Sequence, residues 1–569
     1  YRMGAFFSEP ELYKRVEVLR GPASSTLYGA GALAGVVNFT TKDASDFLKN
    51  GDPLAVRLKA ATETNADAHT LSGIVAAQPV EAVELIGNYN YRRSHEYKSG
   101  NGSIVPASAA LSDSWLVKGR VAIGGNRKHA VWASYQDWVS DAPQLYDQVS
   151  AATGNSVMRR RVHDKTAVLG YVNDFDGSKL LNVEAQLSYA KSLVHQTETT
   201  FLGANLAFSD FSYDSWQGKV QNTSEFKLGG DWTSFLIAGV QWSEQKRRNP
   251  RVSFSGVITP GAGTHPEGDM TKYGVFSQLE IMWSDKLMII PGVRVDWTDL
   301  KPGATVVNGT RLTNRVKDSG VSPKIAAIYS FTDWLGVFGS AARTVRMPNV
   351  DEIFTLSATR PANPNLKPEK SDNYEAGFTL SFNGLAEKHD KLRLKTTLFR
   401  NDVKNLIINA AGAPGTPYFT NVGRSRFKGV EVEAEYGLGG FFASGSMAII
   451  DGKDRLTGDY LNSIPANSYR LTLGYADVGS GLSGGWTGEF AERQNRVTTG
   501  AFASAGSGLP TPGYGIHSVF LSFKPRSGAA EGFEFRIAAD NIFDRQFRRH
   551  LSALPAEGQT FKFTVANTF

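Results

Sequence analysis

The feature that most constrains this chain is a strict alternation of apolar and polar residues that recurs in segment after segment. In one segment, the residues Val83, Leu85, Gly87, Tyr89 and Tyr91 interleave with the polar residues Glu84, Asn88 and Asn90. A period of two places the two sets on opposite faces of a β-strand. Comparable alternation occurs at 56–60, 181–189, 392–398, 430–436 and 533–537. The sequence therefore predicts an all-β protein.

The lengths of the connections between these segments distinguish two kinds of all-β fold. Apolar faces could pack inside a β-sandwich or face lipid on a membrane barrel. We count 22 candidate strands after about residue 53, and short connections such as 284–286 and 332–334 alternate with long ones. The long connections include 94–113, 140–156, 191–210, 244–269, 343–371 and 495–512. One rim of short turns and one rim of long loops is typical of an up-and-down membrane barrel.

We therefore predict a 22-stranded antiparallel transmembrane β-barrel. An even number of strands places both ends of the barrel at the short-turn rim. The chain closes with an alternating strand, Phe561, Phe563 and Val565, and ends on Phe569. No apolar run reaches the roughly 18 residues that a membrane-spanning helix needs.

Composition excludes several classes of function. The chain has no cysteine, which removes disulfides, thiolate metal sites and cysteine nucleophiles. Lys and Arg exceed Asp and Glu by 61 to 55, but the basic residues are scattered, so nucleic-acid binding has no support. We find no clustered nucleophile and base, and we do not expect an enzyme. Because residue 1 is tyrosine and no signal segment follows, we expect an N-terminal part to be missing.

The first 50 residues differ from the rest of the chain. A short strand near 16–19 is followed by a Gly21-Pro22 turn, a glycine-rich middle and a second strand at 35–40. Glycines there permit positive φ angles and close packing. A nucleotide-binding loop is disfavoured because the segment lacks the Gly-Lys-Ser/Thr of a P-loop.

This segment resembles the end of the plug domain of TonB-dependent outer-membrane receptors. The matching runs are VEVLRGP at 16–22, LYG at 27–29 and GVVN at 35–38, with Ala34 where glycine is usual. The motif residues are Arg20, Gly21, Pro22, Tyr28, Gly29, Gly35 and Asn38. Further matches follow in the family's order at 291–296, 322–324, 363–369, 429–431 and 541–544.

The resemblance implies two units: residues 1–50 as the C-terminal remnant of a plug, and residues 51–569 as the barrel that surrounds it. It also implies ligand uptake across the outer membrane of a Gram-negative bacterium. The implied partners are the TonB-ExbB-ExbD energy-coupling complex, outer-membrane lipid and lipopolysaccharide. Lumen-facing charges are expected to bind the plug: Arg57, Lys59, Lys118, Arg120, Glu184, Glu431 and Glu433. A passive porin-like channel is the alternative from another class, and the plug-like segment argues against it.

The transported ligand is expected to be an iron complex. The run at 37–48 and the VRMP and NPNL boxes at 345–348 and 363–366 resemble the haem and haemoglobin receptor branch, so haem is favoured, either free or delivered by a haemoprotein. A ferric siderophore is the alternative within the family, and cobalamin or oligosaccharide uptake stays open. The resemblance implies no intrinsic cofactor, only haem or a ferric chelate as cargo.

The residues that hold this ligand are harder to assign. An imidazole or phenolate is needed to ligate haem iron, yet 349–362, between the two boxes, contains neither His nor Tyr. Candidates come from predicted outer loops and the boxes: His195, His265, His95, Arg346, Arg360 and Tyr146. Arginine clusters at 159–161 and 246–251 could pair with ligand carboxylates or with lipopolysaccharide phosphates.

Overall fold

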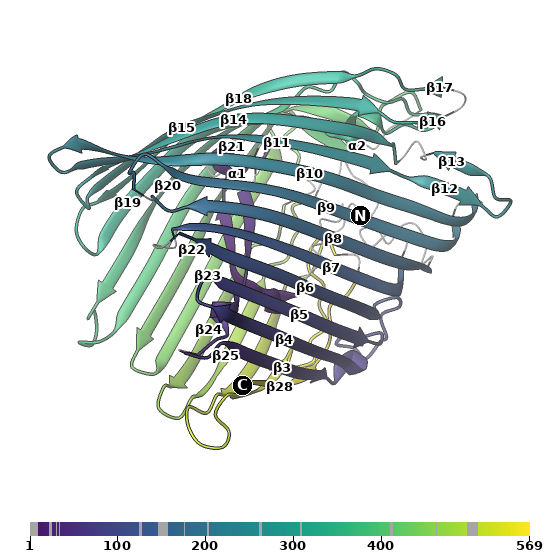
Figure 1. Cartoon of the computed structure of the whole chain (residues 1–569). Helices are drawn as coiled ribbons and strands as arrows, with labels where there is room; N and C mark the ends of the chain where they lie inside the picture. The colour runs from purple at the N-terminus through teal and green to yellow at the C-terminus, as the bar shows by residue number, and fades with distance from the viewer. Residues whose placement is uncertain are drawn as a thin grey trace.

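Twenty-two antiparallel strands close one barrel in the described ranges of the computed structural model (Figure 1). The structure describes residues 9–21, 25–29, 31–33, 35–49, 51–124, 128–145, 157–175, 177–201, 204–260, 265–307, 310–409, 414–461, 464–497, 510–552 and 554–569. The barrel closes where the last strand pairs with the first barrel strand. The predicted fold class is confirmed, and the first barrel strand begins at Leu54, as the alternation indicated.

The barrel strands run in chain order around the wall. They are β3 (Leu54–Glu63), β4 (Ala68–Val80), β5 (Val83–Ser94), β6 (Ala110–Ile123), β7 (His129–Leu145), β8 (Val157–Asn173), β9 (Asn182–Phe201), β10 (Ala204–Gly229), β11 (Trp232–Arg248), β14 (Gly268–Trp283), β15 (Leu287–Pro302), β18 (Val316–Ser330), β19 (Leu335–Arg346), β20 (Glu369–Asn383), β21 (Lys391–Asn409), β22 (Phe419–Leu438), β23 (Phe441–Asp454), β24 (Ser468–Asp477), β25 (Leu482–Ala491), β26 (Tyr514–Phe523), β27 (Phe533–Asp540) and β28 (Thr560–Thr568).

Smaller elements lie inside the barrel or in its connections. Inside are η1 (Pro10–Leu12), β1 (Tyr13–Arg20), α1 (Ser25–Tyr28), β2 (Gly35–Thr41) and η3 (Ala44–Asp46). The connections carry η4 (Asn65–Asp67), β12 (Pro250–Ser253), β13 (Ile258–Pro260), β16 (Val306–Val307), β17 (Thr310–Arg311) and α2 (Val350–Phe354). No helix in the described ranges is both long and apolar enough to cross a membrane.

The alternation in sequence becomes an alternation between lumen and outer surface. Lys219 points inward, because its ammonium lies 5.6 Å from the ring of Tyr28, whereas the next residue, Val220, is 48% exposed on the outside. Aromatic pairs mark the two edges of the apolar surface: Tyr189 with Trp216 at one end and Trp232 with Trp283 at the other. An apolar band between two aromatic girdles is the surface that lipid requires.

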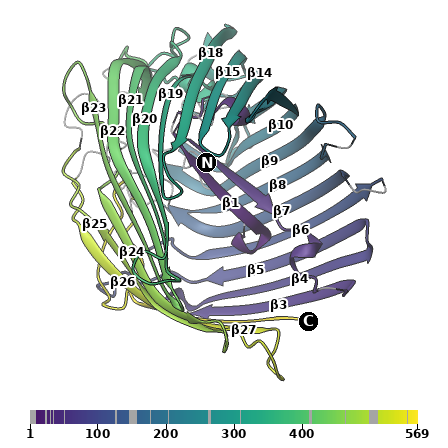
Figure 2. The same cartoon turned by 90° about the vertical axis from the view of Figure 1, so that its left-hand side faces the viewer.

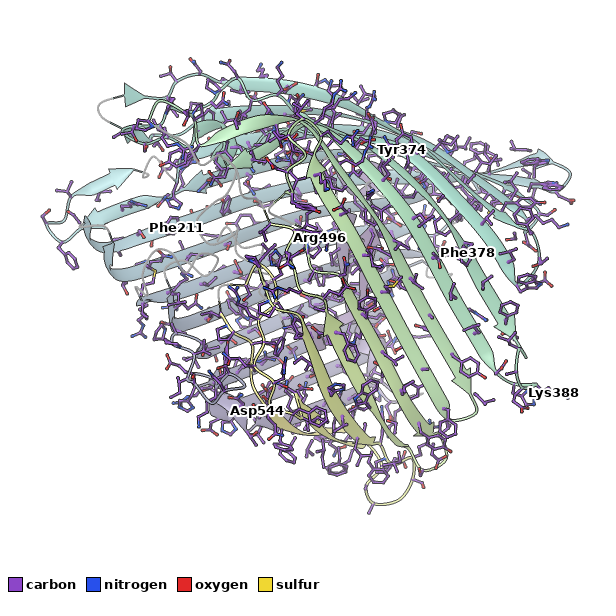
Figure 3. The ribbon with its side chains drawn as sticks, turned by 180° about the vertical axis from the view of Figure 1, so that it is seen from behind. Phe211, Tyr374, Phe378, Lys388, Arg496 and Asp544 are labelled. Atoms are coloured by element: carbon purple, nitrogen blue, oxygen red, sulfur yellow. The ribbon has the colours of Figure 1, made fainter. Side chains whose placement is uncertain are left out.

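The prediction of a loop at 191–210 is wrong. β9 and β10 stay paired from Lys191 opposite Asp214 to Phe201 opposite Ala204. Past the aromatic girdle both faces of these strands carry polar residues, so the alternation disappears while the backbone pairing continues. The predicted loops at 140–156 and 244–269 also begin as strand, since β7 reaches Leu145 and β11 reaches Arg248. Figure 3 shows Phe211 in this half and Lys388 in a short turn of the opposite rim.

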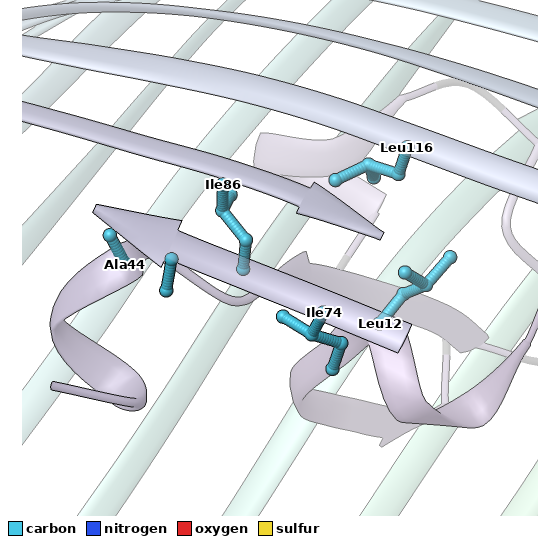
Figure 4. Packing of buried hydrophobic residues seen from close by; sticks show 6 residues of the cluster. Leu12, Ala44, Ile74, Ile86 and Leu116 are labelled. Carbon is cyan, nitrogen blue, oxygen red and sulfur yellow. The ribbon is translucent and has the colours of Figure 1, made fainter. Parts of the chain in front are cut away.

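The chain before β3 forms an inner segment, residues 9–49, within the barrel (Figure 2). β1 pairs antiparallel with β2, from Arg15 opposite Thr40 to Arg20 opposite Gly35. Apolar side chains of the inner segment pack against the barrel wall and form a small core with it (Figure 4). The members of this core are Leu12, Ala44, Ile74, Ala76, Ile86 and Leu116. This packing fixes one end of the inner segment against β4, β5 and β6.

Candidate functional site

Charged contacts attach the inner segment to the wall formed by β3–β6. The Glu11 carboxylate binds the Arg57 guanidinium at 3.1 Å and also the Lys59 ammonium. Lys118 binds Asp43 at 2.7 Å. The Ser45 amide donates to Glu84 at 2.9 Å. These residues turn the polar lumen face of the barrel into a docking surface for its own chain.

A second set of contacts lies on the opposite wall. Arg20 donates to Glu431 at 3.0 Å and to Glu433 at 2.6 Å, both on β22. Gly21 adopts φ +79°, which favours glycine, and a Cβ there would displace the Glu375 carboxylate, whose oxygen lies 2.0 Å from that position. The inner segment therefore spans the lumen between two walls.

Most of the lumen charges that were predicted to bind the inner segment do so: Arg57, Lys59, Lys118, Glu431 and Glu433. The prediction is wrong for two of them. Arg120 binds Glu84, and Glu184 accepts from Gln221, so both pair within the wall.

The other motif residues build the turn between β1 and β2. The Tyr28 ring lies under Lys219. Gly35 adopts φ +133°, and a Cβ there would lie 2.2 Å from the Leu19 carbonyl oxygen. The Asn38 amide donates to Glu17 across the ribbon at 3.0 Å. Gly29, at φ +137°, faces the Gln241 amide, and Pro22 lies outside the described residues.

Acid is expected to weaken the docking of the inner segment. Burial alone would raise the pKa of Glu11 above its ordinary 4.5, but contacts with Lys59 and Arg57 outweigh it and lower the pKa. Within the inner segment itself, burial likewise opposes the contacts of Asp46 with Lys14 and the Asp43 amide, which lower its pKa below 3.8, so Asp46 stabilises the fold of the segment rather than its docking. The docked state thus holds fewer protons, so this stabilisation is complete above about pH 4.5 and is lost as pH falls through the lowered pKa values. Hydrogen exchange of β1 and β2, corrected for intrinsic rates, should rise between pH 5 and about pH 3. Unchanged protection across that range would contradict the expectation.

At the long-loop end, the connection 347–368 folds into the mouth of the barrel. Its short helix α2 buries Ile353 and Phe354 against Leu300 of β15 and Ile407 of β21. Asn349 caps the helix by accepting from the Glu352 amide at 2.9 Å, and the Glu352 carboxylate accepts from the Asn349 amide at 2.9 Å. This capping box and the apolar contacts fix two acidic residues, Asp351 and Glu352, in the mouth.

Arginines from two different strands hold these carboxylates. Arg247 of β11 forms an ion pair with Asp351, which also accepts from the Tyr213 hydroxyl at 3.4 Å. Arg346, at the end of β19, donates to both Glu352 oxygens at 3.0 and 2.9 Å and also binds Glu369. Arg346, a predicted ligand-binding residue, is thus fully engaged within the protein.

His265 is the candidate histidine that the structure brings to the inner side of the mouth. Its half-buried ring makes an edge contact with Phe211 at 5.3 Å between centroids, and Nδ1 lies 3.5 Å from an Arg251 nitrogen. Burial lowers its pKa to about 4, against a small opposing effect of the Asp351 charge. Its imidazole is therefore neutral at physiological pH, which is the form that binds metal.

The other candidate residues are dispersed. The loop position predicted for His195 is wrong: it lies in β9, on the same face as Leu187 and Tyr189, so its ring points outward, where it bonds Asp210. His95 is exposed on the rim, 3.6 Å from Asp67. Arg360 donates to the Thr416 and Pro417 carbonyls at 3.1 and 2.6 Å. Tyr146 lies outside the described residues.

Sequence reasoning placed Arg247 in the arginine cluster at 246–251 but missed its partner Asp351, which is 104 positions away and becomes its neighbour only when β11 and the 347–368 connection meet. No signal in either local sequence marks the pair. Among the described residues, no group of three or more His, Asp or Glu side chains is arranged to hold a metal ion.

Together these features define a large membrane β-barrel whose lumen holds a folded segment of its own chain. The profile of the family described as TonB dependent receptor-like, beta-barrel matches residues 87–542. The chain belongs to this family of transmembrane transport receptors.

Comparison with characterised relatives extends over nearly the whole chain. A hemin receptor of Yersinia enterocolitica is 26% identical over 99% of this chain and 81% of its own length. TonB-dependent heme receptor A of Haemophilus ducreyi is 25% identical over 100% of this chain and 85% of its own length. The Serratia marcescens hemophore receptor HasR, solved as a double mutant with its hemophore HasA and heme, matches with a TM-score of 0.81 at 21% identity, covering 99% of this chain and 88% of that one. At that identity the structural likeness shows the fold alone.

Proposed function

We propose that this protein is an outer-membrane receptor that takes up haem by TonB-coupled active transport. The observation that carries this proposal is that relatives aligned with the whole chain are named as receptors for hemin or heme. In this proposal residues 1–50 are the C-terminal part of a plug, and residues 51–569 are the barrel.

The contacts of the inner segment support a plug that can be moved. Its anchors are mostly ion pairs in a polar lumen, as with Arg20, whose side chain is 53% exposed. Exposed pairs such as this one contribute modestly to stability and can be exchanged for water at little cost, whereas the more buried pairs of Glu11 and Lys118 hold more firmly. A pull through TonB, driven by ExbB and ExbD, could therefore release the plug without unfolding the barrel wall.

The outer surface supports a second partner, lipopolysaccharide. Arg159 and Arg161 lie on the outward face of β8, beyond the aromatic girdle, and both are exposed. Arg159 also pairs with Asp141 at 2.8 Å. Guanidinium groups at this level could bind the phosphates of the outer leaflet as well.

Haem binding is tested by titrating haem into the detergent-purified receptor and following the Soret band. We expect a shifted band, because the iron acquires a protein ligand, and we expect His265→Ala to change its position. His195→Ala is the matched control, since that ring faces outward, and it should leave the band unchanged.

Three other outcomes have distinct meanings. No Soret shift at micromolar haem, together with binding of a ferric siderophore, would replace haem by the siderophore alternative. A shifted band that His265→Ala leaves unchanged would keep the proposed function and remove His265 as the ligand. A large open conductance of the receptor in planar bilayers, without energy coupling, would favour the porin-like channel instead.

A further inference from the structure

Two neighbouring acidic residues of α2 pair with guanidinium groups from two strands of the wall, β11 and β19, which are separated by β14, β15 and β18. Asp351 holds Arg247 from β11, and Glu352 holds Arg346 from β19. Consecutive Cα atoms are about 3.8 Å apart, so one short stretch of backbone brings both pairs together. Both carboxylates that hold these arginines therefore belong to one short element, α2.

Burial decides how these pairs can open. The Arg247 side chain is only 2% exposed, and Glu352 is 12% exposed. Removing a carboxylate from a buried guanidinium leaves an uncompensated charge, which is strongly unfavourable. Replacing it by another carboxylate keeps the charge paired and the bidentate hydrogen bonds intact. The pairs therefore resist water and neutral ligands but can exchange with an anionic ligand.

Arg346 also contacts the inner segment. A Cβ added to Gly31 would lie 2.9 Å from Cγ of Arg346 and 3.7 Å from its Cα, so the Gly31 backbone packs directly on this side chain. Arg346 consequently contacts α2 through its guanidinium and the inner segment through its stem. A change of partner at the guanidinium is transmitted to Gly31 because no space separates them.

Buried apolar side chains, which displacement of α2 would uncover in part, lie beside the two arginines. The Arg247 guanidinium stacks on the Tyr213 ring at 5.5 Å, and Phe211 lies two residues away on the same face of β10. Phe354 and Met347 lie in the 347–368 connection. A ligand that combines an apolar, flat body with two carboxylates matches this combination of side chains.

We propose that Arg247 and Arg346 are the binding site for the two carboxylates of the transported ligand, and that Asp351 and Glu352 are internal occupants that the ligand displaces. This inference rests on the proposed function, since haem carries two propionates on a flat apolar ring. Displacement releases α2 from the arginines and moves Arg346 against Gly31. Ligand charge thereby both opens the mouth and signals to the inner segment.

The test compares haem with haem dimethyl ester, which keeps the iron and the ring but lacks both carboxylates. The purified receptor is expected to bind haem at least about tenfold more tightly than the ester, because hydrogen bonds to charged partners are lost. Asp351→Asn with Glu352→Gln should strengthen haem binding several-fold and leave ester binding unchanged. Arg346→Gln should reduce the preference for haem over the ester.

Asp299→Asn is the matched control, because it removes a carboxylate from an exposed pair with Arg315 on the outer side of the mouth. It should alter neither affinity. Equal binding of haem and ester to the wild-type receptor would overturn this inference and leave the proposed function standing. Absence of binding for both compounds would overturn both. If the double variant bound haem no more tightly than Asp299→Asn, displacement of the internal carboxylates would be wrong.

Discussion

Replacing Gly35 by valine should abolish the docked inner segment. A Cβ at this position would lie 2.2 Å from the Leu19 carbonyl oxygen, and φ is +133°, where a β-branched residue is strongly disfavoured. β1 and β2 cannot move apart to relieve the contact without breaking their pairing. We expect a loss larger than about 4 kcal/mol, enough to unpair the ribbon. Trypsin should then cleave at Lys14, Arg15 and Arg20, which pairing protects.

Gly51→Ala separates the two causes of this effect. Gly51 also has a positive φ, +91°, but a Cβ there meets nothing within 4 Å. It should cost only the backbone strain of about 1 kcal/mol and leave the ribbon resistant to trypsin. Equal cleavage of the two variants would contradict a specific role for the contact between position 35 and the Leu19 carbonyl.

Glu11→Ala should detach the inner segment from β3 while β1 and β2 stay paired. Glu11 is 11% exposed and neutralises Arg57 and Lys59, whose side chains are 18% and 27% exposed. Removing the carboxylate leaves two poorly hydrated cations side by side, although Arg57 keeps its contact with Glu534 at 3.2 Å. We expect the docking free energy to fall by about 2–3 kcal/mol. The measurement is the urea concentration at which trypsin begins to cleave the inner segment.

Glu531→Ala is the control for this variant. Glu531 also binds the inner segment, through Lys49 at 3.7 Å, but both side chains are more than half exposed. Exposed pairs of this kind contribute little, so the urea midpoint should not change. A shift as large as that of Glu11→Ala would mean that the lumen is far less hydrated than the exposed fractions indicate.

The architecture of the wall could be predicted because lipid enforces a period of two. Val220 faces lipid and Lys219 faces the lumen, and no other arrangement satisfies both residues. That rule stops at the aromatic girdle. Beyond Tyr189 both faces of β9 are in water. Polar residues there, such as Lys191 and His195, do not show which face of a strand they lie on, and this strand was therefore predicted as a loop.

The docking of the inner segment was predictable in kind but not pair by pair. Charged residues on the lumen face need partners of opposite charge. From this requirement it was correctly predicted that Glu431 and Glu433 bind the inner segment. It could not distinguish Lys118, which reaches Asp43, from Arg120, two residues along the same face, which pairs with Glu84 in the wall. The ion pairs of the mouth depend on how a loop folds back between distant strands, and alternation contains no information about that.

The order of the anchors along the chain has a mechanical consequence. Glu11 and Arg20 form ion pairs with β3 and β22, respectively. The Thr26 carbonyl accepts a hydrogen bond from Arg294 of β15, and Gly31 packs on Arg346 of β19. A load applied on the N-terminal side of Glu11 reaches these attachments one after another rather than all at once. When one attachment breaks, the chain that it held is released and must be extended before the next attachment bears the load. The inner segment should therefore detach from the barrel in a series of small steps, at a force set by its single strongest attachment. The hydrogen-bonded barrel wall around it should stay intact.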